Sequence, residues 1–107
     1  MKALANETFI PQVTVGEGKK AKLVDEEGCA GYEIKALTSM EFCELISDGS
    51  HELRLGVQFK HADIKRALRL GLVNPDLMNT MSAIHLAKTA KAIYDKANLA
   101  EDERKNS

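Results

Sequence analysis

The stretch YEIKALTSMEFCELI, residues 32–46, decides the fold because its hydrophobic period changes in the middle. From Tyr32 to Leu37 apolar and charged side chains alternate, which is the period of a strand with one buried face. Thr38 followed by Glu41 is a capping box, in which the hydroxyl and the carboxylate each satisfy a backbone N–H of the first helical turn. The chain is therefore predicted to pass here from a β-strand into an α-helix.

Upstream of this point the sequence is typical of short antiparallel strands. Residues 8–10 and 13–15 are β-branched or aromatic and flank Pro11, which suits an edge strand because proline has no N–H to donate. The Gly-Glu-Gly of residues 16–18 predicts a turn before a returning strand at residues 20–24. We expect a small antiparallel meander of three or four strands.

Downstream of Thr38 the sequence predicts helices and one more strand. The first helix has an apolar pattern that includes Cys43 as a small core residue, and it should end at the glycine of residues 48–50. Residues 53–59 alternate between apolar and polar side chains, which favours a strand.

Two further helices follow in the C-terminal half. Asp63 is predicted to cap the second helix, which has an apolar face and a basic face. Residues 74–75, Asn-Pro, open the last helix, since asparagine caps well and proline tolerates the first helical position. Nothing breaks helical structure from there to about Leu99, so we expect one helix of about 25 residues.

The prediction for the whole chain is an α+β fold, with a small antiparallel sheet followed by about three α-helices. Residues 1–100 form a single domain, and residues 101–107 form a polar tail that frays. The length of 107 residues is close to the commonest domain size. The content of 44% hydrophobic and 29% charged residues is that of a globular protein.

The net charge of -1 argues against nucleic-acid binding, because phosphate contacts normally require a basic excess. The basic run of residues 60–69 is bracketed by Asp63 and Asp76, which favours a solvated helix face or a patch for an acidic protein partner. A nucleic-acid-binding regulator that uses this run stays an alternative. No apolar run reaches the length of a membrane span, and residues 1–6 do not resemble a signal peptide, so we expect a cytoplasmic protein.

No catalytic or metal site emerges from the sequence. Cys29, Cys43, His51 and His61 are zinc-ligand types, but none of their spacings matches the short gaps of zinc motifs. Cys29 follows two glutamates, whose charges disfavour a thiolate, and His85 has no acidic residue three or four positions away. We therefore expect no enzymatic activity, no cofactor and no metal.

The last helix leaves two interpretations open. An amphipathic helix of this length, rich in Ala and Met, exceeds what a small sheet can cover, and such surfaces adapt to partner helices. Alternatively, it packs on the sheet or on the two preceding helices and belongs to the core.

Three segments, in this order, carry a resemblance to a known family: residues 22–28 (KLVDEEG), residues 32–39 (YEIKALTS) and residues 70–77 (LGLVNPDL). Together they resemble the tail assembly chaperones of long-tailed bacteriophages. The resemblance covers residues 22–77. The loop after Gly28 lacks the Asn-Pro that is usual in that family.

The resemblance implies that the chain binds the tape measure protein in the host cytoplasm and promotes assembly of the tail tube protein, as a monomer or a weak homo-oligomer. We expect the partner-binding residues to be an apolar stripe with a charged rim: Leu77, Met78, Met81, Ile84 and Ile93, with Arg66 and Arg69 as the rim. The alternative is a virion structural subunit of the head–tail connector or tail-terminator type, which would assemble into a stable ring.

Overall fold

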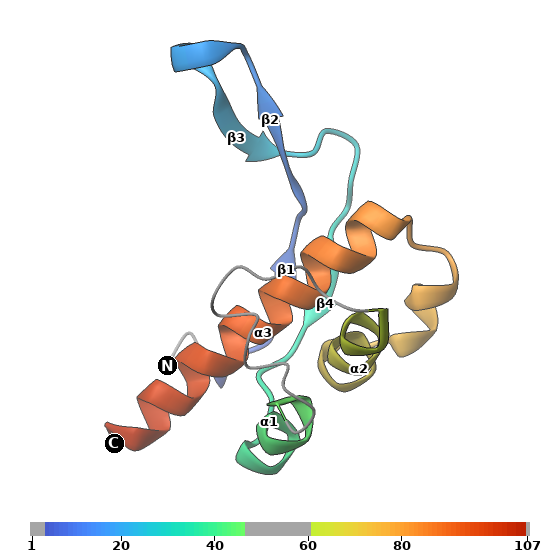
Figure 1. Cartoon of the computed structure of the whole chain (residues 1–107). Helices are drawn as coiled ribbons and strands as arrows, with labels where there is room; N and C mark the ends of the chain where they lie inside the picture. The colour runs from blue at the N-terminus through green and yellow to red at the C-terminus, as the bar shows by residue number, and fades with distance from the viewer. Residues whose placement is uncertain (1–3, 47–60, 107) are drawn as a thin grey trace.

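The computed structural model describes residues 4–46 and 61–106, and it confirms the α+β fold with four short strands ahead of the helices (Figure 1). In chain order the elements are β1 Glu7–Phe9, β2 Gln12–Val15, the 3₁₀ helix η2 Gly18–Lys20, β3 Lys22–Asp25, β4 Tyr32–Ile34, α1 Ser39–Ile46, α2 His61–Gly71, the 3₁₀ helix η4 Pro75–Asn79 and α3 Ala83–Lys105. The predicted helix end at residues 48–50 and the predicted strand at residues 53–59 lie outside the described residues.

The four strands form a nested hairpin, so the predicted meander is wrong. β2 pairs with β3 around the turn that begins at Gly16, and β1 pairs with β4 further from that turn; both pairings are antiparallel. Pro11 interrupts the ladder between the two pairs because it has no N–H, while its carbonyl accepts from the N–H of Glu26 at 2.8 Å. The hairpin is thereby divided into an inner pair, β1–β4, and an outer pair, β2–β3, which projects from the body in Figure 1.

The two connections between the inner and the outer pair differ in length. Residues 10 and 11 alone separate β1 from β2, whereas residues 26–31 separate β3 from β4. The longer side forms a loop that has positive φ at Gly28 and Gly31. At Gly31 a side chain would collide with Thr8, since an added Cβ would lie 2.6 Å from its Cγ2. This loop, residues 26–31, contributes Glu26 and Cys29 to a group of polar side chains around His85.

The inner pair is joined to the helices through the chain that follows α2. Leu72 forms an antiparallel bridge with Ile34. The N–H of Lys35 donates to the Gly71 carbonyl at 2.9 Å, and the N–H of Val73 donates to the Glu33 carbonyl at 3.1 Å. These bonds give β4 partners on both edges, so the end of α2 is held against the sheet.

The capping box at the start of α1 is confirmed. The Thr38 N–H donates to Glu41 Oε1 at 3.0 Å, and the Glu41 N–H donates to Thr38 Oγ1 at 3.1 Å. The prediction that Cys43 is a core residue is wrong, because its side chain is exposed. The helix buries Leu45, and the position of Cys43, two residues away on a 3.6-residue period, faces the opposite side.

The start of α2 differs from the prediction. The helix begins at His61, so Asp63 lies in its first turn and is not the cap. Its carboxylate accepts from Arg66 Nη1 at 3.3 Å, one turn further along. The predicted apolar face is nevertheless present, since Ala67 and Leu68 are buried.

The predicted long helix from residue 75 is broken into two. Asn74 caps η4 by accepting from the Asp76 N–H, as its sequence indicates, but the helix stops at Asn79. α3 then starts afresh, with the Ser82 hydroxyl accepting from the His85 N–H at 3.2 Å. Thr80 adds a second local bond, from its hydroxyl to the Leu77 carbonyl. Hydroxyl side chains that bond to the nearby backbone compete with helix continuation, which accounts for the break.

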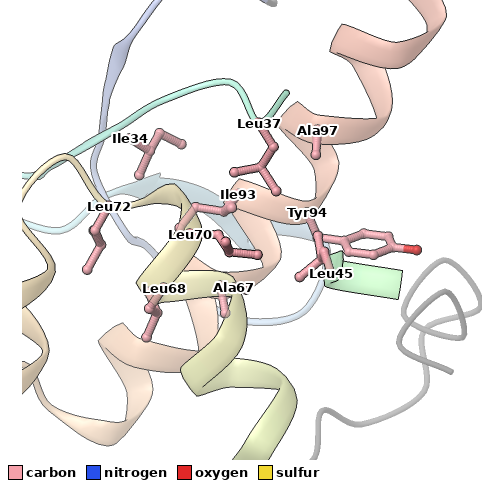
Figure 2. Close-up of a cluster of buried hydrophobic side chains, with 11 residues drawn as sticks. Ile34, Leu37, Leu45, Ala67, Leu68, Leu70, Leu72, Ile93, Tyr94 and Ala97 are labelled. Carbon is pink, nitrogen blue, oxygen red and sulfur yellow. The ribbon is translucent and has the colours of Figure 1, made fainter. Parts of the chain in front are cut away.

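The core lies between the inner strands, α1, α2 and one face of α3 (Figure 2). Ile34 and Leu37 enter it from the strand side, Leu68 from α2, and Ile93 and Tyr94 from α3; all five are at most 1% exposed. Ile93 is therefore a core residue, and its assignment to an exposed partner-binding stripe is wrong. The C-terminal two thirds of α3 is thus covered by the rest of the chain along its apolar face.

The prediction of a frayed tail is also wrong, because α3 continues to Lys105. Arg104 holds this end by donating to the Leu37 carbonyl at 2.7 Å and to Glu101 Oε1 at 2.7 Å. Ala100 is fully buried one turn earlier. The polar residues at this end can stay helical because Arg104 bonds both to Glu101 on the same helix and to the backbone that precedes α1.

Candidate functional site

The remaining residues of the predicted partner-binding stripe lie around the break between η4 and α3. Leu77 and Met78 are half-buried in η4, and Met81 is half-buried in the connection, packed against the core together with Met78. Ile84, in the first turn of α3, is 64% exposed. The structure therefore gathers four of the five apolar candidates in one region, but only Ile84 among them is largely open to solvent.

The two arginines of the predicted rim are both paired within the chain. Arg66 bonds to Asp63 on its own helix, with both side chains mostly buried. Arg69 Nη2 donates to Glu44 Oε1 at 2.6 Å, which joins α2 to α1 at a half-exposed position. Arg69 is accordingly part of the contact between two helices as well as a candidate rim residue.

A hollow of about 350 Å³ lies beside this region, between α2, η4 and the start of α3. Most of its lining is apolar, and the residues that line it are Ile64, Lys65, Leu68, Met78, Asn79, Ala83 and Leu86. Of the predicted site residues, Met78 alone lines it. Lys65 and Asn79 are the polar residues of this lining, and Lys65 adds a positive charge to it.

A second group of side chains, which the sequence analysis did not bring together, lies where the loop of residues 26–31 meets α3. The imidazole of His85 is at its centre: Nε2 is 2.7 Å from Glu26 Oε2, and Nδ1 is 2.5 Å from the Tyr32 hydroxyl. The Tyr32 ring also meets the imidazole edge-on, with the ring centroids 5.6 Å apart. Cys29 completes the group, and one ligand atom from each of Glu26, Cys29 and His85 lies within 4.8 Å of the others.

The hydrogen bonds define the tautomer of a neutral His85. The carboxylate of Glu26 can only accept, so Nε2 carries the proton and donates to it. Nδ1 then has a free lone pair and accepts from the Tyr32 hydroxyl. The imidazole is thus held by two bonds in one orientation, with only 17% of its side chain exposed.

The surroundings of Tyr32 keep its phenol protonated. Burial raises the pKa of Tyr32 above its ordinary 10.0, and the neighbouring Cys29 and Glu26 raise it further, because all three effects disfavour a phenolate. A protonated phenol is the form that can donate to His85 Nδ1. The direction of the pKa shift and the hydrogen bond therefore agree.

Next to this group is a second hollow, of about 390 Å³, which is lined by the loop and by His85. It leaves the cluster accessible from solvent. In the sequence, Cys29 and His85 have no Cys or His partner at zinc-motif spacing, and His85 has no acidic residue three or four positions away. His85 is 59 residues from Glu26, so a search for nearby acidic residues could not detect the pair.

Comparison of the chain with family models, with curated proteins and with solved structures produced no match. Within the described ranges, none of the helices combines the length and the apolar character that crossing a bilayer requires.

Proposed function

We propose that this chain is a phage tail assembly chaperone that binds an amphipathic helix of the tape measure protein and promotes assembly of the tail tube. The proposal rests on the resemblance carried by residues 22–77 and on one structural observation, the apolar hollow between α2, η4 and α3. The partner's class and the cytoplasmic location in the host follow from the resemblance.

The hollow is suited to the side chains of a helix. Its volume is at the low end of the range for binding pockets, so it fits anchor residues better than a complete small molecule. Helix-in-groove recognition uses apolar anchors at successive turns, and methionine in the lining allows the surface to adapt to several sequences. Met78 lines the hollow, and exposed Ile84 follows Ala83, a lining residue, at the start of α3.

The experiment that tests this proposal is a pull-down of tape measure protein fragments by the tagged chain, with variants at the mouth of the hollow. Ala83→Asp is the most informative variant because Ala83 is exposed, lines the hollow and is the first residue of α3. A carboxylate at a helix N-terminus favours the helix, so the fold should be retained. We expect at least a tenfold loss of fragment binding, and a similar loss for Ile84→Asp.

The matched control is Leu99→Asp, which places the same charge on a comparably exposed residue of α3, 58% against 64% for Ile84. Leu99 lies near the other end of the helix, so binding should be unchanged. Equal binding by all three variants would show that the hollow is not the binding surface. Failure of the unsubstituted chain to retain any tape measure fragment would reject the function itself.

The second candidate is a ring-forming virion subunit, and the outer strand pair supports it. β2 and β3 form a two-stranded sheet on which Leu23 is 64% exposed and Val15 is 39% exposed. Exposed strand edges with apolar side chains are surfaces on which chains associate. Light scattering distinguishes the two candidates: a stable ring that dissociates on Leu23→Lys supports the virion subunit, whereas a monomer supports the chaperone.

A further inference from the structure

We propose that Glu26, Cys29 and His85 form a binding site for a transition-metal ion, with zinc as the ion that fits the ligand set best. This inference is independent of the proposed chaperone function. It rests on the convergence of a carboxylate, a thiol and an imidazole from two separate parts of the chain.

The three ligand types are those of zinc sites in proteins. Zinc binds thiolate sulfur at about 2.3 Å and imidazole nitrogen or carboxylate oxygen at about 2.0–2.2 Å, so ligand atoms in a tetrahedral shell are roughly 3.3–3.7 Å apart. The three ligand atoms here already lie within 4.8 Å of one another. To reach the tetrahedral spacing, the most distant of these atoms would have to approach one another by about 1–1.5 Å.

The backbone holds two of these ligands close together. Glu26 and Cys29 are the ends of a turn in which the Cys29 N–H donates to the Glu26 carbonyl at 3.4 Å. Gly28 supplies the positive φ that the turn uses. A pair of ligands on a short turn, with a third ligand from another element, is a common way to build a metal site.

The bonding of His85 suits a metal ligand as well. When Nε2 binds a metal, its proton has to leave, and the neutral imidazole then carries its proton on Nδ1. Nδ1–H then donates to the oxygen of Tyr32, which reverses the direction that this bond has in the tautomer protonated on Nε2. The hydroxyl of Tyr32 is thus the outer partner that metal-bound histidines usually have, and it fixes the ring in place.

The charges balance when the metal is bound. The Cys29 thiol releases one proton to solvent and binds as a thiolate, and together with the Glu26 carboxylate it neutralises a divalent cation. The adjoining hollow leaves room for water at the fourth position. Bound metal would tie the loop between β3 and β4 to the first turn of α3, and so fix the outer strand pair relative to the body.

The test is titration of the reduced, chelator-treated full chain with cobalt(II) chloride, followed by displacement with zinc chloride. We expect one metal ion per chain, a thiolate-to-cobalt charge-transfer band, release of one proton, and a higher melting temperature with zinc. Cys29→Ser should abolish the band. Cys43→Ser is the matched control, since Cys43 is the other cysteine and is exposed on α1, and it should leave the band unchanged.

Two further variants make the assignment specific. His85→Gln and Glu26→Gln should each weaken binding at least tenfold, and circular dichroism checks that both remain folded. Tyr32→Phe tests the positioning role: the ring packing stays, but loss of the hydroxyl should weaken binding 10- to 100-fold. The proposal is rejected if the chain binds no cobalt, if the band survives in Cys29→Ser, or if His85→Gln binds as tightly as the unsubstituted chain.

Discussion

The inner and outer halves of the same β-hairpin differ in how they are held. In the inner half, β4 carries buried Ile34 and is bonded on one edge to β1 and on the other to the chain after α2. In the outer half, β2 and β3 are paired with each other, and their residues are exposed or half-buried. Figure 1 shows this half projecting beyond the helices.

The difference shows that strand pattern alone does not decide what a strand contributes to stability. Both halves have β-branched residues and regular antiparallel pairing, but the inner half has helices on one face. Burial of apolar surface against those helices supplies the stabilisation, because exposed pairs gain little from it. The outer half is held to α3 by Lys88 Nζ, which donates to the Gln12 carbonyl, and the loop after β3 is held to α3 by the bond between Glu26 and His85.

The largest expected effect comes from truncating a buried leucine next to the inner half, compared with an exposed leucine in the outer half. Leu37 is fully buried just after the inner pair, whereas Leu23 in β3 is 64% exposed. We expect Leu37→Ala to lower the free energy of unfolding by about 3 kcal/mol, because it loses apolar contacts and leaves a cavity. Leu23→Ala should change it by less than about 0.5 kcal/mol. Urea denaturation measures both, and equal losses would show that the outer half is packed as tightly as the inner half.

A smaller loss of stability is expected from a substitution at Gly71, where the end of α2 packs against Ile93 of α3. At Gly71 an added Cβ would lie within 2.8 Å of Ile93 Cδ1 and Cγ1, and any shift of Ile93, which is fully buried, would disturb its neighbours in the core. We expect Gly71→Ala to destabilise the protein by about 2 kcal/mol through overpacking.

A double-mutant cycle separates this overpacking from other causes. Ile93→Ala alone creates a cavity, and in that background Gly71→Ala adds a methyl group where space has become available. The second substitution should then cost less than about 0.5 kcal/mol. If Gly71→Ala costs as much in the Ile93→Ala background as in the original chain, close packing against Ile93 is not the reason for glycine at this position.

The smallest effect is expected at the junction of the two halves and depends on pH. The pKa of Tyr32 is raised in the folded protein above its ordinary value of 10.0, by burial and then by Cys29 and Glu26. Between these two pKa values the unfolded chain has lost the proton and the folded chain has kept it. The stabilisation is therefore complete below pH 10.0 and is lost as the pH rises through the folded-state pKa.

Denaturation at a series of alkaline pH values, for the original chain and for Tyr32→Phe, measures this contribution. The original chain should lose stability more steeply above pH 10.0 than the variant, which has no phenol to titrate. Parallel curves would indicate that Tyr32 is as open to solvent in the folded protein as in the unfolded chain.

The local elements were determined by the sequence itself. Each of these elements involves groups within a few residues of one another: the capping box of Thr38 and Glu41, the asparagine cap at Asn74 and the turn at Gly16. Such groups find the same partners in almost any tertiary context, so their pattern could be interpreted before the fold was known. The α+β class followed from the change of period at Thr38.

The tertiary structure alone decided how these elements associate. The nested pairing of the strands, the burial of Ile93 and the anchoring of Arg104 on the Leu37 carbonyl join residues far apart in the chain. The cluster of Glu26, Cys29 and His85 is of the same kind. The hydrophobic period of a helix or strand shows which of its faces is buried, but not which other element covers that face. Many pairings of elements bury a similar apolar area, so the choice among them depends on packing over the whole chain.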